Sequence, residues 1–199
     1  MMLRNKAIAG FVLWFLLVYG LLMAPWPGLQ NAYRAAYLDA GQFVFQTLTS
    51  PDTIRFKAPD VVEGEVDTVV LVRYREAGVW ITLGINSRQG AYLPTVVLAS
   101  LILATPVPWS RRGVSLLLGL VLVHLFIVVR LTIVVLSAYF FMWGLNTGAD
   151  ASLWTKVFVA GVKFAATGQG LGYIVPTIIW VLVAIPREQL NRILSERRR

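Results

Sequence analysis

The chain contains no cysteine and only one histidine among its 199 residues. Without cysteine there is no disulfide, no thiolate metal site and no cysteine nucleophile. Because His124 is the single histidine, a metal site made only of histidines cannot form within one chain. We therefore expect neither a metal nor another cofactor to be bound.

Charged residues are also scarce. They make up 14% of the chain, whereas 57% of it is hydrophobic, and soluble domains carry about 25% charged residues. This balance predicts an integral membrane protein. The net charge is +8, but the basic residues gather near the N-terminus, at Arg111 and Arg112, and in residues 187–199. That distribution indicates membrane topology rather than a nucleic-acid-binding surface.

Long apolar stretches predict a mainly α membrane protein with four transmembrane helices. Residues 1–24 form the first helix, which stays uncleaved because no small-x-small site follows it. Residues 91–185 form a core of three further spans, at 91–107, 113–144 and 168–186. Residues 186–199 are a basic cytoplasmic tail. Every basic cluster then lies on one side, which predicts cytoplasmic N- and C-termini in a bacterial inner membrane.

A small extracytoplasmic α+β insertion is predicted between the first two spans, over residues 25–90. Residues 30–49 have the spacing of an amphipathic helix, lying either in the membrane interface or on a β-domain. Residues 53–85 alternate with a period of two, which predicts an antiparallel sheet of two or three strands. The acids Asp60, Glu63, Glu65 and Asp67 fit a solvated loop or edge strand better than a calcium site. A second interfacial helix is predicted at 151–167, inside the three-span core.

Two polar residues interrupt the longest apolar run, His124 and Arg130. An arginine near the middle of a span costs about 2.5–3.5 kcal/mol, so it needs a partner. No acidic residue lies between Glu76 and Asp150. Arg130 then either reaches outward to the polar cluster at residues 86–89, pairs with an acid on a partner helix, or binds a substrate or lipid phosphate. His124 is either a neutral side chain bonded to a neighbouring helix or a proton carrier.

Residues 86–112 (NSRQGAYLPTVVLASLILATPVPWSRR) and 166–176 (ATGQGLGYIVP) resemble the exosortase H-associated membrane proteins. The resemblance implies a small multi-span companion of a sorting transpeptidase. True exosortases resemble cysteine peptidases that use a cysteine, an arginine and a histidine near the outer face. Here Ser87 stands near the nucleophile position, but serine needs a general base. His124 and Arg130 are six positions apart, about 120° around a helix.

These observations predict a non-enzymatic accessory or scaffold subunit that positions a partner in a bacterial inner-membrane complex, such as a protein-sorting system. The expected partners are membrane lipids and another integral membrane protein or multi-subunit complex, and not nucleic acid. Two alternatives stay open: a degenerate exosortase-like peptidase or transpeptidase with Ser87 and Arg130 as catalytic residues, and a small-solute transporter. The candidate binding residues are Asn86, Arg88, Gln89, His124 and Arg130.

Overall fold

The computed structural model describes residues 2–26, 28–49, 53–59, 66–74, 78–147, 161 and 170–184. They are mainly helical and include one small sheet. The predicted interfacial helix at 151–167, apart from Gly161, lies outside the described residues, as do the basic tail at 186–199 and the acidic residues at 60–65.

The chain forms two compact units. The helical unit comprises Met1–Ala24, Leu93–Leu125 and Gly172–Arg199, and the sheet unit comprises Pro25–Tyr92 and Phe126–Leu171. Helix α4 (Trp109–Thr147) contributes its first half to the helical unit and its second half to the sheet unit.

The sheet unit contains a three-stranded antiparallel sheet in the order β1-β2-β3, as the period-two pattern predicts. The strands are β1 (Ile54–Lys57), β2 (Thr68–Tyr74) and β3 (Val79–Ile85). Gly78 precedes β3 with φ of 66°, a left-handed conformation that favours glycine. The register places Val70 opposite Leu83 and Val72 opposite Ile81, so alternate apolar side chains share one inner face.

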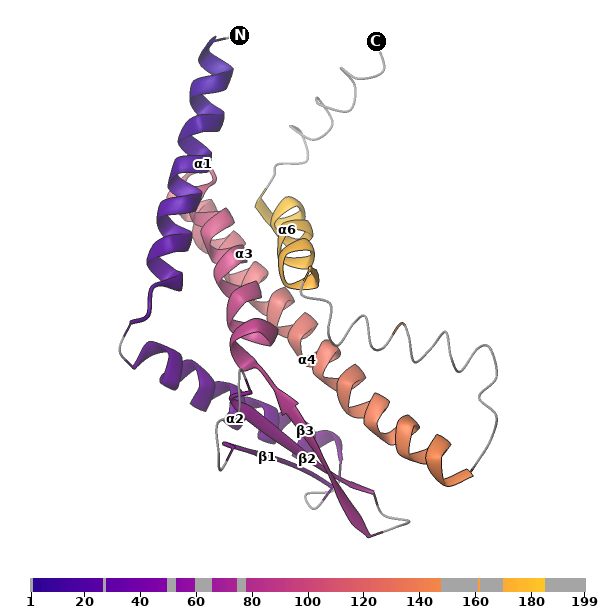
Figure 1. Cartoon of the computed structure of the whole chain (residues 1–199). Coiled ribbons are helices and arrows are strands. Elements are labelled where there is room, and N and C mark those ends of the chain that lie inside the picture. Colours follow the sequence, from indigo (N-terminus) through magenta and orange to yellow (C-terminus); the bar gives the residue numbers. More distant parts are fainter. Residues whose placement is uncertain are drawn as a thin grey trace, which may run out of the picture. The chain divides into compact units, whose positions relative to one another are not determined.

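Helix α2 (Leu29–Leu48) packs on that inner face (Figure 1). The sequence left two locations open for this helix, the membrane interface and the surface of a β-domain. In the structure the helix lies on the sheet. Phe45 lies in the core, and Gly41 allows a close approach, since a Cβ there would be 2.7 Å from Cε1 of Phe56. Phe43 points away from the sheet and is 72% exposed.

The second half of α4 closes the same core. Leu131 and Val135 are buried with Phe45, Ile54 and two valines of β2. The predicted membrane span at 113–144 includes this part of the helix. The structure adds that it has folded protein on one side, because an apolar stripe packs on a sheet as readily as it faces lipid.

The helical unit consists of α1 (Met2–Met23), α3 (Leu93–Ala104), the first half of α4, and α6 (Leu171–Ala184). Helix α1 lies along α3 (Figure 1). The buried core is formed by Leu98, Ile102, Val123 and Ile179. Gly119 of α4 faces α3 so closely that a Cβ would be 3.0 Å from Ile102 and 3.2 Å from Leu98. Small residues of this kind let two helices approach closely.

Polar contacts fix the connection between α3 and α4. Thr105 accepts a hydrogen bond from Trp180 Nε1 on its hydroxyl at 2.7 Å, and one from Arg112 Nε on its carbonyl at 3.1 Å. The Arg112 guanidinium also lies 4.6 Å from the ring of Trp109. Because Trp180 belongs to α6, these contacts tie that helix to the α3–α4 turn.

One helix of the described residues, Trp109–Ala138, is both long and apolar enough to cross a membrane. The apolar helices Ile8–Met23, Arg88–Ala104 and Leu171–Ala184 are shorter than the about 20 residues that a span needs. The structure therefore supports a mainly helical chain with one candidate membrane helix, and it does not support four transmembrane helices.

Candidate functional site

The polar cluster predicted at residues 86–89 begins the helix that follows β3. Asn86 is its N-cap: the side-chain Oδ1 accepts the backbone N–H of Gln89 at 3.0 Å, and the backbone carbonyl accepts the N–H of Gly90 at 2.9 Å. A short π-helical turn, η1 (Arg88–Tyr92), leads directly into α3. Asparagine is favoured at this position because it satisfies an N–H that the helix leaves unpaired.

Ser87 is bound twice by one carboxylate. Its backbone N–H donates to Asp67 Oδ1 and its hydroxyl donates to Asp67 Oδ2, both at 2.7 Å. Ser87 is only 2% exposed. The carboxylate also lies at the start of a helix, where the partial positive charge favours an anion.

This geometry decides what the Ser87 hydroxyl can do chemically. A serine nucleophile needs a strong enough general base, usually histidine, and a route for the substrate to its oxygen. The group that accepts its hydrogen bond here is a carboxylate, which is a much weaker base than histidine. The arrangement caps a helix and leaves the hydroxyl without an activating base among its contacts.

Tyr37 of α2 and Arg130 of α4 belong to the same unit as this pair. Burial raises the pKa of the Tyr37 phenol, and negative charge at Tyr33 and Asp67 raises this pKa further, whereas the charge of Arg130 lowers it. The phenol therefore stays protonated at neutral pH and remains a hydrogen-bond donor. The electrostatic neighbours of Tyr37 come from α2, from the start of β2 and from α4.

Arg130 is thus close to a buried phenol. Arg130 is itself half-buried. The partners expected for Arg130 were the polar cluster at residues 86–89, an acid on a partner helix, or a substrate or lipid phosphate. The structure places Tyr37 of α2 in the electrostatic environment of Arg130.

His124 lies in the other compact unit and is exposed. Its Nδ1 is 2.7 Å from the carbonyl oxygen of Leu120, one turn earlier in the same helix. The contact that the structure gives this nitrogen is within its own helix, and a bond from His124 to a neighbouring helix stays a prediction. In an apolar helix, the backbone carbonyl four residues earlier is a nearby hydrogen-bond acceptor for a histidine side chain.

Two more residues complete the surroundings of the cap. Arg88 is exposed on η1. Tyr92, at the end of η1, meets Tyr33 of α2 edge to face, with ring centroids 5.1 Å apart. Such a pair is worth about 0.5–1.5 kcal/mol beyond the area it buries. It fixes η1 against α2.

Sequence reasoning missed Asp67 and Tyr37. Asp67 was interpreted, with three other acids, as part of a solvated segment. It directly precedes the β-branched residues of β2, and this position could have indicated that Asp67 belongs to the folded sheet. No comparable signal marks Tyr37. Among the described residues, no group of three or more His, Cys, Asp or Glu side chains is placed to hold a metal ion.

Comparisons of the chain with protein-family models, with curated proteins and with solved structures gave no match.

Proposed function

We propose that the chain is a non-enzymatic accessory subunit of a bacterial inner-membrane complex, such as a protein-sorting system, in which it holds a partner protein. The observation that carries this proposal is the outward apolar surface of the helical unit. Bulky aliphatic and aromatic side chains face outward on three of its helices, including Leu13 (66% exposed), Leu117 (69%) and Leu182 (72%). Exposed apolar surface of this kind fits lipid or another membrane protein.

Helix α1 contributes most to this surface. The exposed side chains Val12, Leu13, Trp14, Leu16 and Leu17 are nearly consecutive in the sequence, so they project on most sides of the helix. A helix that is apolar all round needs an apolar surrounding on every side. Its contact with α3 covers only a part of it.

The proposed membrane arrangement keeps the four predicted spans, with both termini in the cytoplasm. Helix α4 has 39 residues and is about 58 Å long, which exceeds the about 30 Å of a bilayer's hydrocarbon core. The three shorter helices cross in this proposal together with their flanking residues. The positions of the basic clusters along the sequence support this topology.

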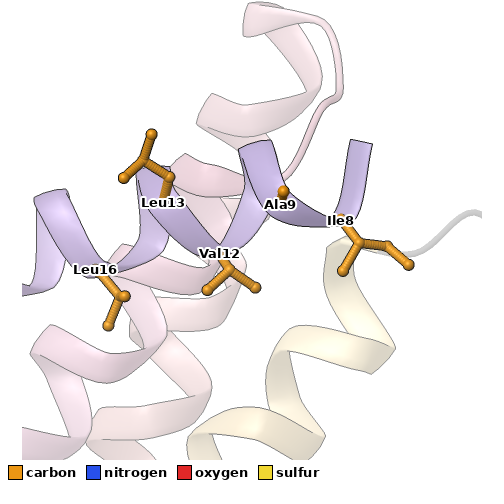
Figure 2. Close-up of a pocket in the computed structure, with 5 residues that line it drawn as sticks. All are labelled: Ile8, Ala9, Val12, Leu13 and Leu16. Atoms are coloured by element: carbon orange, nitrogen blue, oxygen red, sulfur yellow. The ribbon is translucent and has the colours of Figure 1, made fainter. Parts of the chain in front are cut away.

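A shallow groove on α1 suits a partner helix. It has a volume of about 480 Å³ and is lined by Ile8, Ala9, Val12, Leu13 and Leu16, which form one stripe along the helix (Figure 2). The small side chain of Ala9 lies between larger ones, and small residues let a second helix approach closely in a membrane.

The environment of Ser87 supports a non-enzymatic role. Its hydroxyl and its backbone N–H are both used by Asp67, in a cap that the helix after β3 requires. The alternative peptidase needs that hydroxyl as a nucleophile. The predicted resemblance to the companions of a sorting transpeptidase agrees with a supporting role.

The test is purification of the tagged full chain from native membranes in mild detergent. We expect the chain to resist extraction by alkaline carbonate and to bring an integral membrane protein with it. Ala9→Phe fills the groove and should remove that partner, whereas Leu182→Phe, on exposed surface of α6, should retain it. Release by carbonate, or equal recovery of the partner with both variants, would overturn the proposal.

A further inference from the structure

The first half of α4 presents a stripe of exposed side chains in which one member is polar. Each member lies three or four positions from another, so the stripe runs along one side of the helix. Its residues are Val114, Leu117, Leu118, Val121, His124 and Leu125, all of the helical unit. His124 is thus a single imidazole on an otherwise apolar, outward-facing surface.

The contact of the His124 ring decides which of its nitrogens carries the hydrogen. Nδ1 lies 2.7 Å from the carbonyl oxygen of Leu120, and a carbonyl oxygen can only accept a hydrogen bond. Nδ1 therefore carries the hydrogen, and in the neutral ring Nε2 then has an acceptor lone pair. No hydrogen bond joins Nε2 to any residue that the structure describes. The stripe therefore contains one unused acceptor.

His124 lies at the midpoint of the candidate membrane helix Trp109–Ala138, since residues 109–123 precede it and residues 125–138 follow it. It is therefore about 21 Å along the helix from either end. Lipid headgroups lie near those ends, and hydrocarbon tails have no hydrogen-bond donor. The histidine side chain is too short to extend to the interface as lysine and arginine do. Lipid cannot satisfy this acceptor, whereas a side chain of another helix can.

We propose that this stripe of α4 binds a transmembrane helix of a partner protein, and that this helix carries a hydroxyl or carboxamide group that donates a hydrogen bond to Nε2 of His124. Such groups bond across helices in membranes, and one polar residue in an apolar helix interface specifies the register of the pair. In a parallel pair of copies related by a twofold axis, two acceptors would face each other, so a second copy is not the occupant. The inference rests on the proposed function, because it names the chemistry of the partner helix.

The single histidine of the chain permits a direct spectroscopic test. The full chain with ¹⁵N-labelled histidine, reconstituted in phosphatidylcholine bilayers, gives the signals of one imidazole, and their chemical shifts report which nitrogen is protonated. We expect a protonated Nδ1 and an unprotonated Nε2. Adding a polyleucine transmembrane peptide with one central asparagine should move the Nε2 signal. The same peptide with leucine at its centre should not.

Binding of the two peptides is measured by energy transfer to a dye at the C-terminus of the chain, at a low peptide-to-lipid ratio. The asparagine peptide should bind roughly three- to twentyfold more tightly than the leucine peptide, as expected for one hydrogen bond between helices. His124→Leu should abolish this difference, and His124→Gln, whose amide oxygen is an acceptor, should keep part of it. Leu125→Val, an apolar change in the same stripe, is the matched control and should leave the difference unchanged.

Several results would overturn the inference. A proton on Nε2 in the absence of peptide would make this nitrogen a donor. Equal binding of the two peptides, or a difference that persists in His124→Leu, would exclude the hydrogen bond. A Nε2 signal that moves with the concentration of the chain, and not with peptide, would assign the stripe to self-association. Loss of the native partner from Ala9→Phe leaves these measurements with synthetic helices unaffected, so the two proposals fail separately.

Discussion

Ser87 gives its backbone N–H and its hydroxyl hydrogen to the two oxygens of a single carboxylate, that of Asp67, with both distances at 2.7 Å. Asp67 precedes β2 and Ser87 follows β3, so the pair joins the two ends of a hairpin to the start of the next helix. The contact is made at a buried position, where hydrogen bonds to a charged group are worth most.

Removing either partner should destabilise the sheet unit by different amounts. Ser87→Ala loses one hydrogen bond to a carboxylate and should lower the free energy of unfolding by about 1.5–3 kcal/mol. Asp67→Asn should cost more, because both hydrogen bonds lose their charged acceptor and the amide turns a donor toward Ser87. Chemical unfolding in mild detergent measures both, with the exposed Gln46→Ala as control. A cost no larger than that of the control would contradict the cap.

A serine-directed fluorophosphonate should not label Ser87. The hydroxyl is 2% exposed and donates to a carboxylate, so it is neither accessible nor activated. Mass spectrometry of the treated full chain measures the modification. Labelling that disappears in Ser87→Ala would revive the peptidase alternative.

Replacing each of two helical glycines with alanine should have opposite effects on stability. Gly41→Ala places a Cβ 2.7 Å from the ring of Phe56 and should cost about 1–3 kcal/mol of stability. Gly10→Ala meets nothing within 4 Å and should be neutral or stabilising by up to about 1 kcal/mol. Phe56→Leu in the Gly41→Ala background should recover part of the loss. Equal effects of the two alanines on the melting temperature would show that α2 does not pack closely on the sheet.

Thr68→Val should stabilise the protein. The Thr68 side chain is fully buried on the inner face of β2, and its hydroxyl has no hydrogen-bond partner among the described residues. Valine has the same shape without the polar group, so the variant removes a desolvation cost of about 1–3 kcal/mol. Unfolding experiments should show a higher midpoint. A destabilised Thr68→Val would mean that the hydroxyl has a partner.

Because the phenol of Tyr37 is buried, we expect the protein to lose stability at alkaline pH. Its pKa is raised above the ordinary value of about 10, mainly by burial. The folded state therefore holds this proton more tightly than the unfolded state. The stability that the protonated phenol contributes is complete below pH 10 and is lost as the pH rises above 10. Tyr37→Phe should lose less stability than the parent chain between pH 10 and 11. Parallel losses in the two proteins would place Tyr37 in solvent.

The strands and α2 could be predicted because their side chains follow a clear period. Val70 and Val72 alternate with outward residues, and Tyr37 and Val44 recur at helical spacing. The packing of the second half of α4 on the sheet could not be predicted, because hydropathy alone does not separate a lipid-facing stripe from one that packs on a sheet. The span predicted from residue 91 begins inside η1, because the polar residues before it are part of the helix start. That they cap a helix depends on the contacts of Asp67.

The sheet places two arginines over the ring of Trp80, which has a consequence for how this sequence can vary. Arg55 and Arg73 lie on different strands but share one indole ring, so replacing one changes the position available to the other. Their effects should be non-additive, as expected for residues with a common partner. Substitutions at positions 55, 73 and 80 should therefore be coupled, although the first and the last lie 25 positions apart. Replacement of one arginine by lysine should be tolerated only while the other arginine still stacks on the ring.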